Sequence, residues 1–276
     1  MKTTIEVKDH SVSGELFRLE YDAKLHMYIT SPKPSEENLP SYYASEDYIS
    51  HTDGKRSLFE KMYQVVKGIT LSRKQKLLHS YLPQKGSLLD IGAGTGDFLE
   101  YAAAKGWTAS GVEPSEKARS LAKQKKVTLI EELPETSSGY DAITMWHVLE
   151  HVYDLKTQIR WIKNNLSREG VLFVAVPNFE SYDASYYKTD WAAYDVPRHL
   201  YHFSKKSIEL LFEEQNMSVR AIHPMKFDAY YVSLLSEKYK TGKMKFLNAF
   251  WNGWRSNQKA RKTGAYSSLI YVIKHQ

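Results

Sequence analysis

A glycine-rich turn is the part of this sequence whose residue types and spacing best suit ligand chemistry. Three glycines, Gly92, Gly94 and Gly96, alternate with other residues directly after a short apolar run that contains Asp90. Because glycine has no Cβ, the backbone can turn sharply there and a ligand can approach it closely. A helix is expected to begin at Asp97, and the N-terminus of a helix attracts anionic groups. The turn therefore predicts a site for a nucleotide-type cofactor.

The spacing of the glycines separates two classes of cofactor. The dinucleotide fingerprint requires glycines at i, i+2 and i+5, but the third of these positions is Asp97. Glu113 follows the next expected strand, Thr108–Val112, where a carboxylate can accept two hydrogen bonds from a ribose diol. Together these features disfavour NAD and leave another cofactor with a ribose as the better fit. A glycine turn with a purely structural role, or another nucleotide cofactor, remains an open alternative.

The pattern Asp-x-Gly-x-Gly-x-Gly over Asp90–Gly96 resembles motif I of class I S-adenosylmethionine-dependent methyltransferases. Later segments resemble a subgroup of that superfamily, the ubiquinone-biosynthesis-type O-methyltransferases (methyltransferase domain type 23). Ala142–His151 is similar to their motif IV, and Ala192–Ser204 is similar to the segment after their fifth strand. The resemblance extends at least through Val219 and implies methyl transfer from S-adenosylmethionine, with S-adenosylhomocysteine as the product.

Residue by residue, the resemblance also implies the cofactor site. Asp90 would orient the methionine end of the cofactor, Glu113 would hold the ribose, and the loop after the third strand would reach the adenine. The complete set of expected cofactor-binding residues is Asp90, Gly92, Ala93, Gly94, Gly96, Glu113, Pro114, Glu132, Leu133, Trp146 and His147.

The resemblance further implies a small-molecule methyl acceptor, with oxygen as the expected acceptor atom. An oxygen of high pKa needs a general base, most often His, and His199 and His147 are the catalytic candidates. Arg198 and His151 are the expected substrate-binding residues, because a guanidinium can hold a carboxylate or phosphate by two parallel hydrogen bonds. An RNA or other nucleic-acid methyltransferase, and a non-catalytic cofactor-binding module of the same fold, remain alternatives. The sequence does not identify the acceptor.

His147–His151 also reads H-x-x-E-H, the inverted zincin motif. It directly follows an expected strand and no helix with a third ligand is evident, which argues against a metalloprotease. Ubiquinone-pathway relatives hold a divalent cation with Glu, Glu and His where this chain has His147, Glu150 and His151. An imidazole in the first position disfavours Mg²⁺, which prefers oxygen ligands. We therefore expect no bound metal.

Cysteine is absent from the sequence, which bears on the N-terminal segment. Relatives of this subgroup often begin with a cysteine-paired zinc ribbon, and the hairpin around Asp22–His26 lies at the corresponding place. The resemblance therefore implies a degenerate zinc-ribbon segment that keeps the hairpin and has lost the metal. Two expected strands form this hairpin, Leu16–Tyr21 and Leu25–Thr30.

The scaffold that positions these residues is expected to be a Rossmann-like α/β domain. Strands alternate with helices from residue 87 onward, which predicts a seven-stranded, mostly parallel sheet with helices on both faces and an antiparallel last strand. The expected strands are Leu88–Ile91, Thr108–Val112, Val127–Ile130, Ala142–Trp146, Val171–Val176, Val219–Ile222 and Ser267–Ile273. Two helices, Ser57–Lys67 and Ser72–Leu82, are expected before the first strand.

Two segments lie outside this α/β pattern. Residues 1–56 are expected to form the N-terminal hairpin and a lid-like helical extension, and residues 57–276 the methyltransferase domain. A helical insertion at about residues 228–264 separates the last two strands. Its large apolar residues share one helical face, which predicts core, a dimer seam or a lid over the site. These residues are Phe246, Leu247, Phe250, Trp251 and Trp254.

Composition restricts the class of protein further. The chain has 276 residues, 42% hydrophobic and 25% charged, which is ordinary globular usage. It has no apolar run long enough to span a membrane and no signal-peptide core near its start, so a cytoplasmic protein is expected. The net charge is +6, and eight Lys/Arg but no Asp/Glu lie between Lys238 and Lys262. Such a stretch is either a solvated helical face or a patch for an acidic substrate, lipid headgroups or RNA. Nucleic acid is the less favoured partner, and a homodimer remains open.

Overall fold

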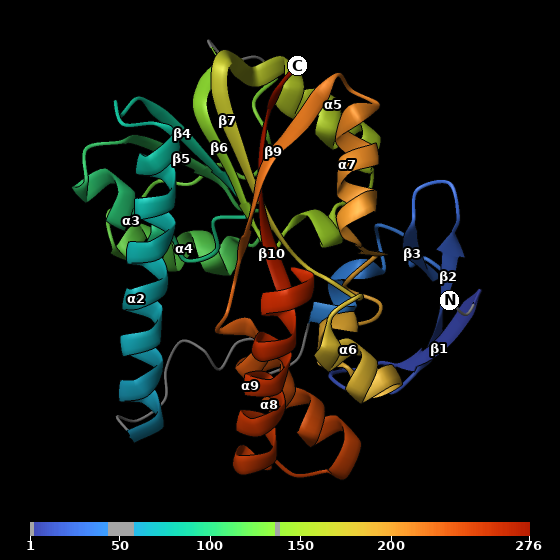
Figure 1. Cartoon of the computed structure of the whole chain (residues 1–276). Helices are drawn as coiled ribbons and strands as arrows, with labels where there is room; N and C mark the ends of the chain where they lie inside the picture. Colours follow the sequence, from blue (N-terminus) through green and yellow to red (C-terminus); the bar gives the residue numbers. More distant parts are fainter. Residues whose placement is uncertain (1–2, 44–57, 136–138) are drawn as a thin grey trace.

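The computed structural model describes residues 3–43, 58–135 and 139–276, and its centre is a six-stranded sheet in the order β5-β4-β6-β7-β10-β9 (Figure 1). The neighbouring strands from β5 to β7 pair in parallel, and β10 runs antiparallel to both β7 and β9. The order of the strands reverses between β4 and β6. In open α/β sheets, ligands bind beyond the carboxyl ends of the strands at such a switch point. The six strands are β4 (Ser87–Ile91), β5 (Thr108–Val112), β6 (Tyr140–Trp146), β7 (Leu166–Pro177), β9 (Met217–Pro224) and β10 (Ser268–His275).

The sheet has six strands because the segment expected as the third strand, Val127–Ile130, is not one. Ile130 forms a single parallel bridge to Val112 at the sheet edge. The amide of Val127 instead donates to the carbonyl of Ala122 at 3.1 Å, which closes the end of helix α4 (Glu116–Gln124). With its first amide used by the helix, the segment is too short to form a ladder. The prediction of seven strands was wrong at this point.

Helices cover both faces of the sheet with separate apolar cores. Helices α2 (Leu58–Tyr81) and α3 (Asp97–Ala104) pack on one face, where Leu78 and Phe98 meet Phe173 of β7. Helices α5 (Leu155–Asn165) and α7 (Lys205–Glu213) pack on the other. Successive residues of β7 alternate between the two cores, as the two-residue period of a strand requires. The sheet is thus held rigidly from both sides.

Helix α2 is one continuous helix of 24 residues, whereas the sequence predicts two helices separated near Gly68. A glycine inside a helix costs about 1 kcal/mol relative to alanine, which is too little to interrupt a helix whose C-terminal half is anchored by the buried side chain of Leu78. The hydroxyl of Thr70 donates to the carbonyl of Val66 at 2.9 Å and so follows the helical path. The continuous helix brings Lys74 and Leu78 to the sheet.

The N-terminal residues form a second, antiparallel sheet in the order β1-β2-β3-β8. The expected hairpin is confirmed: β2 (Leu16–Asp22) pairs with β3 (Met27–Ser31), and the carboxylate of Asp22 accepts backbone hydrogen bonds from Lys24 and Leu25. The sequence analysis did not predict the outer strands, β1 (Thr4–Lys8) and β8 (Tyr201–His202). A 3₁₀ helix, η1 (Leu39–Tyr43), follows. The expected domain boundary at residue 56 lies outside the described residues.

The insertion between β9 and β10 is a helical hairpin of α8 (Asp228–Thr241) and α9 (Phe246–Thr263), beside the short helix α6 (Tyr182–Tyr187) (Figure 1). The aromatic residues of α9 are not core residues, since Trp251 and Phe250 are each 54% exposed. The expectation that this face belongs to the core was therefore wrong. No helix within residues 3–43, 58–135 and 139–276 is both long and apolar enough to cross a bilayer.

Candidate functional site

The candidate site lies where β4 and β6 end, at the switch point of the sheet. Asp90 in β4 is 2% exposed, and its carboxylate accepts a 2.6 Å hydrogen bond from the hydroxyl of Thr144 in β6. Burial raises the pKa of Asp90 to about 7, although Thr144 and the nearby Lys74 favour its charged form. A buried carboxylate that is costly to ionise is suited to a ligand that brings a positive charge.

The glycine turn leaves β4 in a conformation that only glycine adopts readily. Gly92 and Gly94 have φ of 69° and 54°, in the left-handed region. A Cβ on Gly92 would lie 2.4 Å from Cγ2 of Val148, so no other side chain fits. Nothing lies within 4 Å of a Cβ built on Gly94, so the turn is open on that side. Ala93 is buried beneath the turn.

Glu113 lies across the turn from Gly94 and is held in place from both sides. Its two carboxylate oxygens accept hydrogen bonds of 2.9 Å from the amides of Gly94 and Ser115. A carboxylate offers about four lone-pair positions, so two remain for a ligand. Pro114 is exposed beside it, and its carbonyl accepts a hydrogen bond from Arg119. Glu113 is thereby oriented before any ligand binds.

The residues expected near the adenine follow Ile130 at the same edge. The amide of Glu113 donates to the carbonyl of Ile130 at 2.9 Å, which brings the loop that follows next to Glu113. Glu132 is exposed, whereas Leu133 is half-buried against the core. Glu131 forms an ion pair of 2.9 Å with Arg119. The place expected for the planar base is therefore lined by the apolar side chain of Leu133 and by carboxylates that can accept hydrogen bonds.

Asp97 explains why the helix after the turn differs from a dinucleotide site. Its carboxylate pairs with Lys125 of α4 at 2.7 Å and with Lys67 of α2 at 2.8 Å. Burial raises its pKa, but these partners together lower it below the ordinary value. A carboxylate at the start of a helix is favoured by the helix dipole. Asp97 thus has a structural role at the position where the dinucleotide fingerprint requires a glycine.

Lys74 is a residue of this site that the sequence analysis missed. Its Nζ lies 4.3 Å from the ring centroid of Trp146, the last residue of β6. Burial lowers the pKa of Lys74 to about 8, against the attraction of Asp90 and Asp228. One signal was available in the sequence: a lysine between Leu71 and Leu78 on the apolar side of an expected helix. A cationic side chain on the apolar side of a helix is a candidate for binding a ligand.

His147 follows β6 and is held between two carboxylates. Its Nε2 lies 3.0 Å from Oδ2 of Asp228 at the start of α8, and its Nδ1 lies 3.4 Å from Oε1 of Glu150. Burial alone would lower the pKa of His147, but the two carboxylates raise it to about 10. His147 therefore carries a positive charge at neutral pH, which suits it to electrostatic positioning better than to accepting a proton.

Glu150, His151 and His199 form a compact buried group beside His147. One ligand atom from each lies within 4.8 Å of the others, a grouping that could hold a metal ion. Glu150 is fully buried, and neither of its carboxylate oxygens has a hydrogen-bond donor among the described residues. Burial raises the pKa of Glu150, but His147 and the other imidazoles hold it below the ordinary value. This is an ionised carboxylate inside the protein.

The two histidines of this group differ in which nitrogen is available. Nδ1 of His199 donates to the carbonyl of Ala193 at 2.9 Å, which leaves Nε2 as an acceptor. Burial and the nearby His199 lower the pKa of His151 to about 4, so that imidazole is neutral. Nδ1 of His151 lies 3.0 Å from both the hydroxyl of Tyr43 and the carbonyl of Arg198. Nε2 of His199 is thus the better placed proton acceptor.

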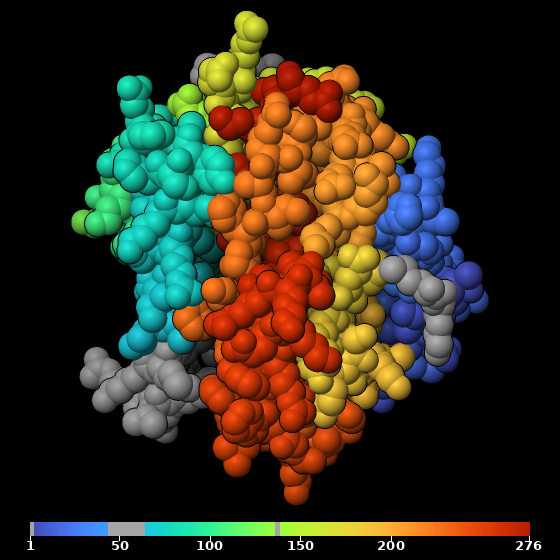
Figure 2. All heavy atoms as spheres, viewed as in Figure 1, coloured from blue at the N-terminus to red at the C-terminus, as the bar shows by residue number. Residues whose placement is uncertain are grey.

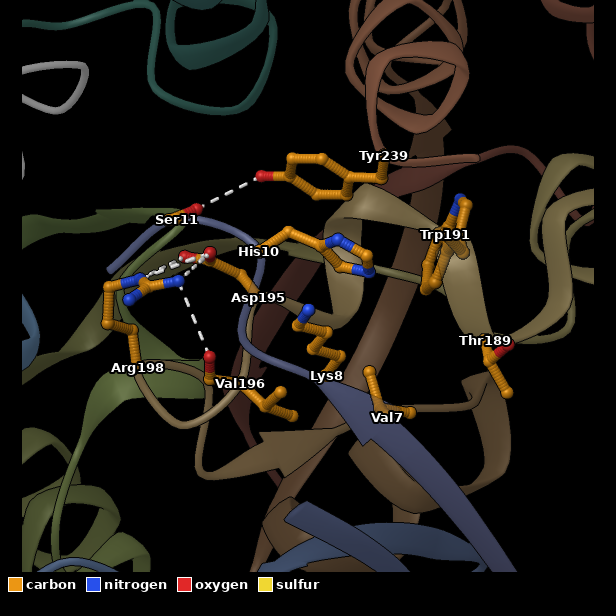
Figure 3. A pocket seen from close by; sticks show the side chains of 10 residues that line it. All are labelled: Val7, Lys8, His10, Ser11, Thr189, Trp191, Asp195, Val196, Arg198 and Tyr239. Atoms are coloured by element: carbon orange, nitrogen blue, oxygen red, sulfur yellow. Dashed lines mark hydrogen bonds and ion pairs between the residues drawn. The ribbon is translucent and has the colours of Figure 1, made fainter. Parts of the chain in front are cut away.

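Arg198 is linked to this group through Asp195, whose Oδ2 lies 4.0 Å from Nε2 of His199. Figure 3 shows the side chain of Arg198 near residues of the N-terminal segment. It is 1% exposed, and its guanidinium pairs with Asp195 at 2.6 Å and with Asp9 at 3.0 Å. Another of its nitrogens donates to the carbonyl of Tyr42 at 2.9 Å. The adjoining cavity of about 10 Å³ has room for little more than one water molecule.

Solved structures with the same fold are methyltransferases. Magnesium protoporphyrin IX methyltransferase from Synechocystis PCC 6803, with bound SAH, is 16% identical; the match covers 88% of this chain and 100% of that chain, with a TM-score of 0.58. Geranyl diphosphate C-methyltransferase from Streptomyces coelicolor A3(2), in complex with Mg²⁺, geranyl diphosphate and S-adenosyl-L-homocysteine, is 14% identical, with coverages of 87% and 97% and a TM-score of 0.57. A plantazolicin methyltransferase in complex with SAH is 17% identical, with coverages of 86% and 94% and a TM-score of 0.52.

At these identities the similarity establishes the fold, which is that of Rossmann-like S-adenosylmethionine-dependent methyltransferases. The sequence establishes the family, because residues 66–222 match the methyltransferase domain (type 23) over more than half of the chain. This chain belongs to that methyltransferase domain family. No curated protein matches its sequence. The solved relatives act on a porphyrin, an isoprenoid diphosphate and a peptide-derived product, so the fold does not define the acceptor.

Proposed function

We propose that this protein transfers a methyl group from S-adenosylmethionine to an oxygen atom of a small-molecule acceptor, in the manner of the ubiquinone-biosynthesis-type O-methyltransferases. The observation that carries the proposal is the pair of pre-oriented carboxylates, Asp90 and Glu113, on either side of an open glycine turn at the switch point of the sheet. The cofactor supplies an electrophilic methyl group on a sulfonium. The protein supplies alignment and exclusion of water.

The groups around the turn fit the two ends of this cofactor. Glu113 has lone pairs left for a ribose diol after binding Gly94 and Ser115. The methionine end of the cofactor is an amino acid with one positive and one negative group. Asp90 offers it a negative group and Lys74 a positive one. The indole nitrogen of Trp146 is buried without a hydrogen-bond partner in the described part of the chain, so it is a further free donor.

His199 is the residue we assign as general base. Its Nδ1–H is fixed by the carbonyl of Ala193, and its Nε2, 4.0 Å from Oδ2 of Asp195, is the nitrogen that would accept a proton from a hydroxyl acceptor. Glu150 lies beside it as an ionised carboxylate and stabilises an imidazolium formed during the reaction. His147 is already charged and positions Glu150 and Asp228. His151 lies between Tyr43 and His199, where it would contact the acceptor.

Two segments outside the sheet close over this group. Asp228 of α8 pairs with His147, and Tyr43 of η1 reaches His151. The insertion therefore contributes to the site through the first residue of α8, whereas Trp251 of α9 is on the exposed face. The fully engaged guanidinium of Arg198 favours a positioning role for this residue, in which it holds the lid-like extension in place.

Titration calorimetry tests the cofactor assignment. We expect S-adenosylmethionine and S-adenosylhomocysteine to bind and NAD not to bind. Glu113→Gln should weaken binding by about 1.5–3 kcal/mol, the range for hydrogen bonds to a charged group, while Glu213→Gln, at an exposed position of α7, should leave it unchanged. Equal affinity for NAD, or an unaffected Glu113→Gln variant, would contradict the proposal.

Measurements of turnover test the proposed methyl transfer and the role of His199. Metabolites retained by the protein with S-adenosylhomocysteine present identify acceptors, and formation of S-adenosylhomocysteine from S-adenosylmethionine measures transfer. His199→Asn keeps a donor towards Ala193 and removes Nε2, so it should lower the rate by about 10²–10⁴-fold with cofactor affinity retained. His223→Asn, which alters only the contact with Tyr81, is the matched control. Cofactor binding without turnover on any acceptor would instead indicate a non-catalytic module, and transfer confined to RNA would exclude a small-molecule acceptor.

A further inference from the structure

Helix α9 has its polarity inverted with respect to an ordinary surface helix. Such a helix buries its apolar stripe and exposes its polar residues. In α9 the large apolar side chains face solvent, and Leu247 is 78% exposed. The exposed residues of this face, with their exposed fractions, are Phe246 (57%), Leu247 (78%), Phe250 (54%), Trp251 (54%) and Trp254 (41%).

The opposite, buried face of α9 is made of small and polar residues that are fixed by hydrogen bonds. Ser256 donates to the carboxylate of Asp183 at 2.6 Å, and Asn252 donates to the hydroxyl of Tyr187 at 3.1 Å. Asn257 donates to the carbonyl of Lys226 at 2.9 Å. These contacts define which face of α9 is inside, so rotation of the helix cannot bury its aromatic face.

The exposed aromatic residues also pack on one another. The rings of Trp251 and Trp254 are perpendicular, with centroids 5.7 Å apart, and Phe250 stacks on Tyr230 of α8. Beside them a groove of about 410 Å³ runs between α6 and α9, lined by Tyr186, Trp251 and Arg255. The face is therefore preorganised and not a set of loose side chains.

Charge around this face is of one sign. Glu237 is the last acidic residue of the sequence, and the residues after it are exclusively basic or neutral. The tip between α8 and α9 carries Lys243 and Lys245, and Met244 between them is 42% exposed. The C-terminal half of α9 adds Arg255, Lys259, Arg261 and Lys262. The space-filling view shows α8 and α9 forming one protruding end of the molecule, which a flat surface could reach (Figure 2).

We propose that the α9 face is a docking surface for an anionic lipid bilayer. Trp and Phe side chains flanked by Lys and Arg are the composition of helices that lie in the membrane interface, with the apolar face among the acyl chains and the cations at the phosphates. The protein would bind peripherally, with α9 parallel to the membrane plane. This inference does not rest on the proposed function, because it uses none of the residues of the methyl-transfer site.

Two other occupants fit the α9 face less well. A second copy of the chain would bring two faces together that carry only positive charge, without an acidic residue to pair with. RNA would match the charge and stack on aromatic rings, but it would leave Leu247 and Met244 exposed, since these side chains cannot stack on bases. A bilayer satisfies the aliphatic, aromatic and basic groups together.

Vesicle sedimentation of the full chain tests this inference. Binding to vesicles of phosphatidylglycerol and phosphatidylcholine should exceed binding to pure phosphatidylcholine by at least about tenfold and should weaken with salt. Leu247→Glu should reduce binding by about tenfold or more, because the most exposed apolar side chain becomes an anion. Leu16→Glu is the matched control: Leu16 is 61% exposed on β2 and is not part of the α9 face, so its substitution should leave binding unchanged.

A second measurement reports insertion independently of these variants. Lipids brominated along the acyl chain should quench the tryptophan fluorescence of the native protein, and this quenching should be largely lost in the variant Trp251→Phe with Trp254→Phe. Absence of quenching, or equal vesicle binding by Leu247→Glu and native protein, would overturn the proposal. So would a dimer in solution that Leu247→Glu dissociates, or binding of single-stranded RNA in place of vesicles with the same sensitivity to Leu247→Glu.

Discussion

Asp90 and Lys74 are opposite charges buried at the same edge of the sheet, and burial disfavours the charged form of each. It raises the pKa of Asp90 to about 7 and lowers that of Lys74 to about 8. Between the ordinary Asp value of 3.8 and about 7, the folded protein binds a proton at Asp90 that the unfolded chain does not. The contribution of Asp90 to stability therefore falls as the pH rises through this interval. These residues are arranged for a ligand at the expense of the free protein.

Asp90→Asn tests that view. The variant keeps an acceptor for Thr144 and has no charge to bury, so its melting temperature relative to the native protein should rise from pH 4 to pH 8. Its affinity for S-adenosylmethionine should fall at the same time. Thermal unfolding at several pH values and calorimetry measure both effects. A melting-temperature difference that is independent of pH would show that Asp90 is not the titrating group.

His147 occupies the position where relatives of the ubiquinone type place the first carboxylate of a metal site. Its charged imidazole lies 3.4 Å from Glu150 and neutralises it. A cation beside Glu150 would be repelled by His147, so we expect no stoichiometric zinc in the purified protein by elemental analysis. His147→Glu replaces the positive charge with a second carboxylate and should create affinity for Mn²⁺ or Mg²⁺.

The matched control for this metal prediction is His147→Gln, which removes the charge without adding a carboxylate and should bind these ions more weakly than His147→Glu. Calorimetry with each metal salt measures the difference. One zinc ion per chain in the native protein would contradict the prediction, and the ligands would then be Glu150, His151 and His199.

At the scale of elements, the close packing of α8 on α9 depends on one glycine. A Cβ on Gly253 would lie 2.9 Å from the Cα of Tyr230 and 3.0 Å from the carbonyl of Ala229, so backbone would have to move. Gly253→Ala should therefore destabilise the protein by about 1–3 kcal/mol despite the better helix propensity of alanine. Thermal or denaturant unfolding measures this change.

Gly68→Ala in α2 is the matched comparison. A Cβ on Gly68 would meet nothing within 4 Å, so only helix propensity acts. That variant should be stabilised, by up to about 1 kcal/mol. Opposite signs for the two substitutions are expected; stabilisation of both would show that α8 can shift away from α9 at little cost.

The elements that follow local periodicity were predictable. Apart from the segment Val127–Ile130, the order of strands and helices from Ser87 to Pro177, the glycine turn and the position of Glu113 follow from short patterns in the sequence. Where neighbouring elements compete for the same backbone, the patterns failed: Val127 closes helix α4 instead of starting a strand. The short strand β8 exists only because β3 lies beside it, and nothing in its two residues indicates pairing.

The candidate site was predictable to the same degree. Asp90 and Glu113 could be assigned because they lie at fixed distances from the glycines. Lys74 and Asp228 could not, since they reach the site from helices that are distant in sequence and whose packing no local pattern fixes. The charge of His147 depends on Asp228 in the same way. Sequence therefore indicates which residues are candidates for binding a ligand, and the fold decides their protonation.

At the scale of the whole molecule, a second layer covers the acceptor side of the central sheet. The N-terminal sheet, α6 and the segment before β8 share one apolar core that includes Phe17, Tyr187 and Trp191. Tyr43 extends from this layer to His151. The geometry around His151 thus depends on how firmly the N-terminal residues are attached, and the pair of Arg198 with Asp9 is one of their polar links to the segment around β8, beside the hydrogen bonds of Thr30 to the carbonyl of His199 and of Ser204 to the carbonyl of His26.

Arg198→Ala should weaken the attachment of the N-terminal strands β1 to β3. The substitution leaves Asp9, 1% exposed, without its cationic partner, and breaking a buried pair on one side costs about 3–5 kcal/mol. Backbone donors from Ser13 and the guanidinium of Arg198 hold the pKa of Asp9 below its usual range against the effect of burial, so this contribution is present near neutral pH and is lost as the pH falls. Arg18→Ala removes an exposed pair of 3.9 Å with Glu20 in the same sheet and should cost no more than about 1 kcal/mol.

Hydrogen exchange should show faster opening of β1 to β3 in Arg198→Ala while β4 to β7 stay protected. Uniform loss of protection across both sheets would mean that the two layers unfold as one unit and that Arg198 does not govern the attachment.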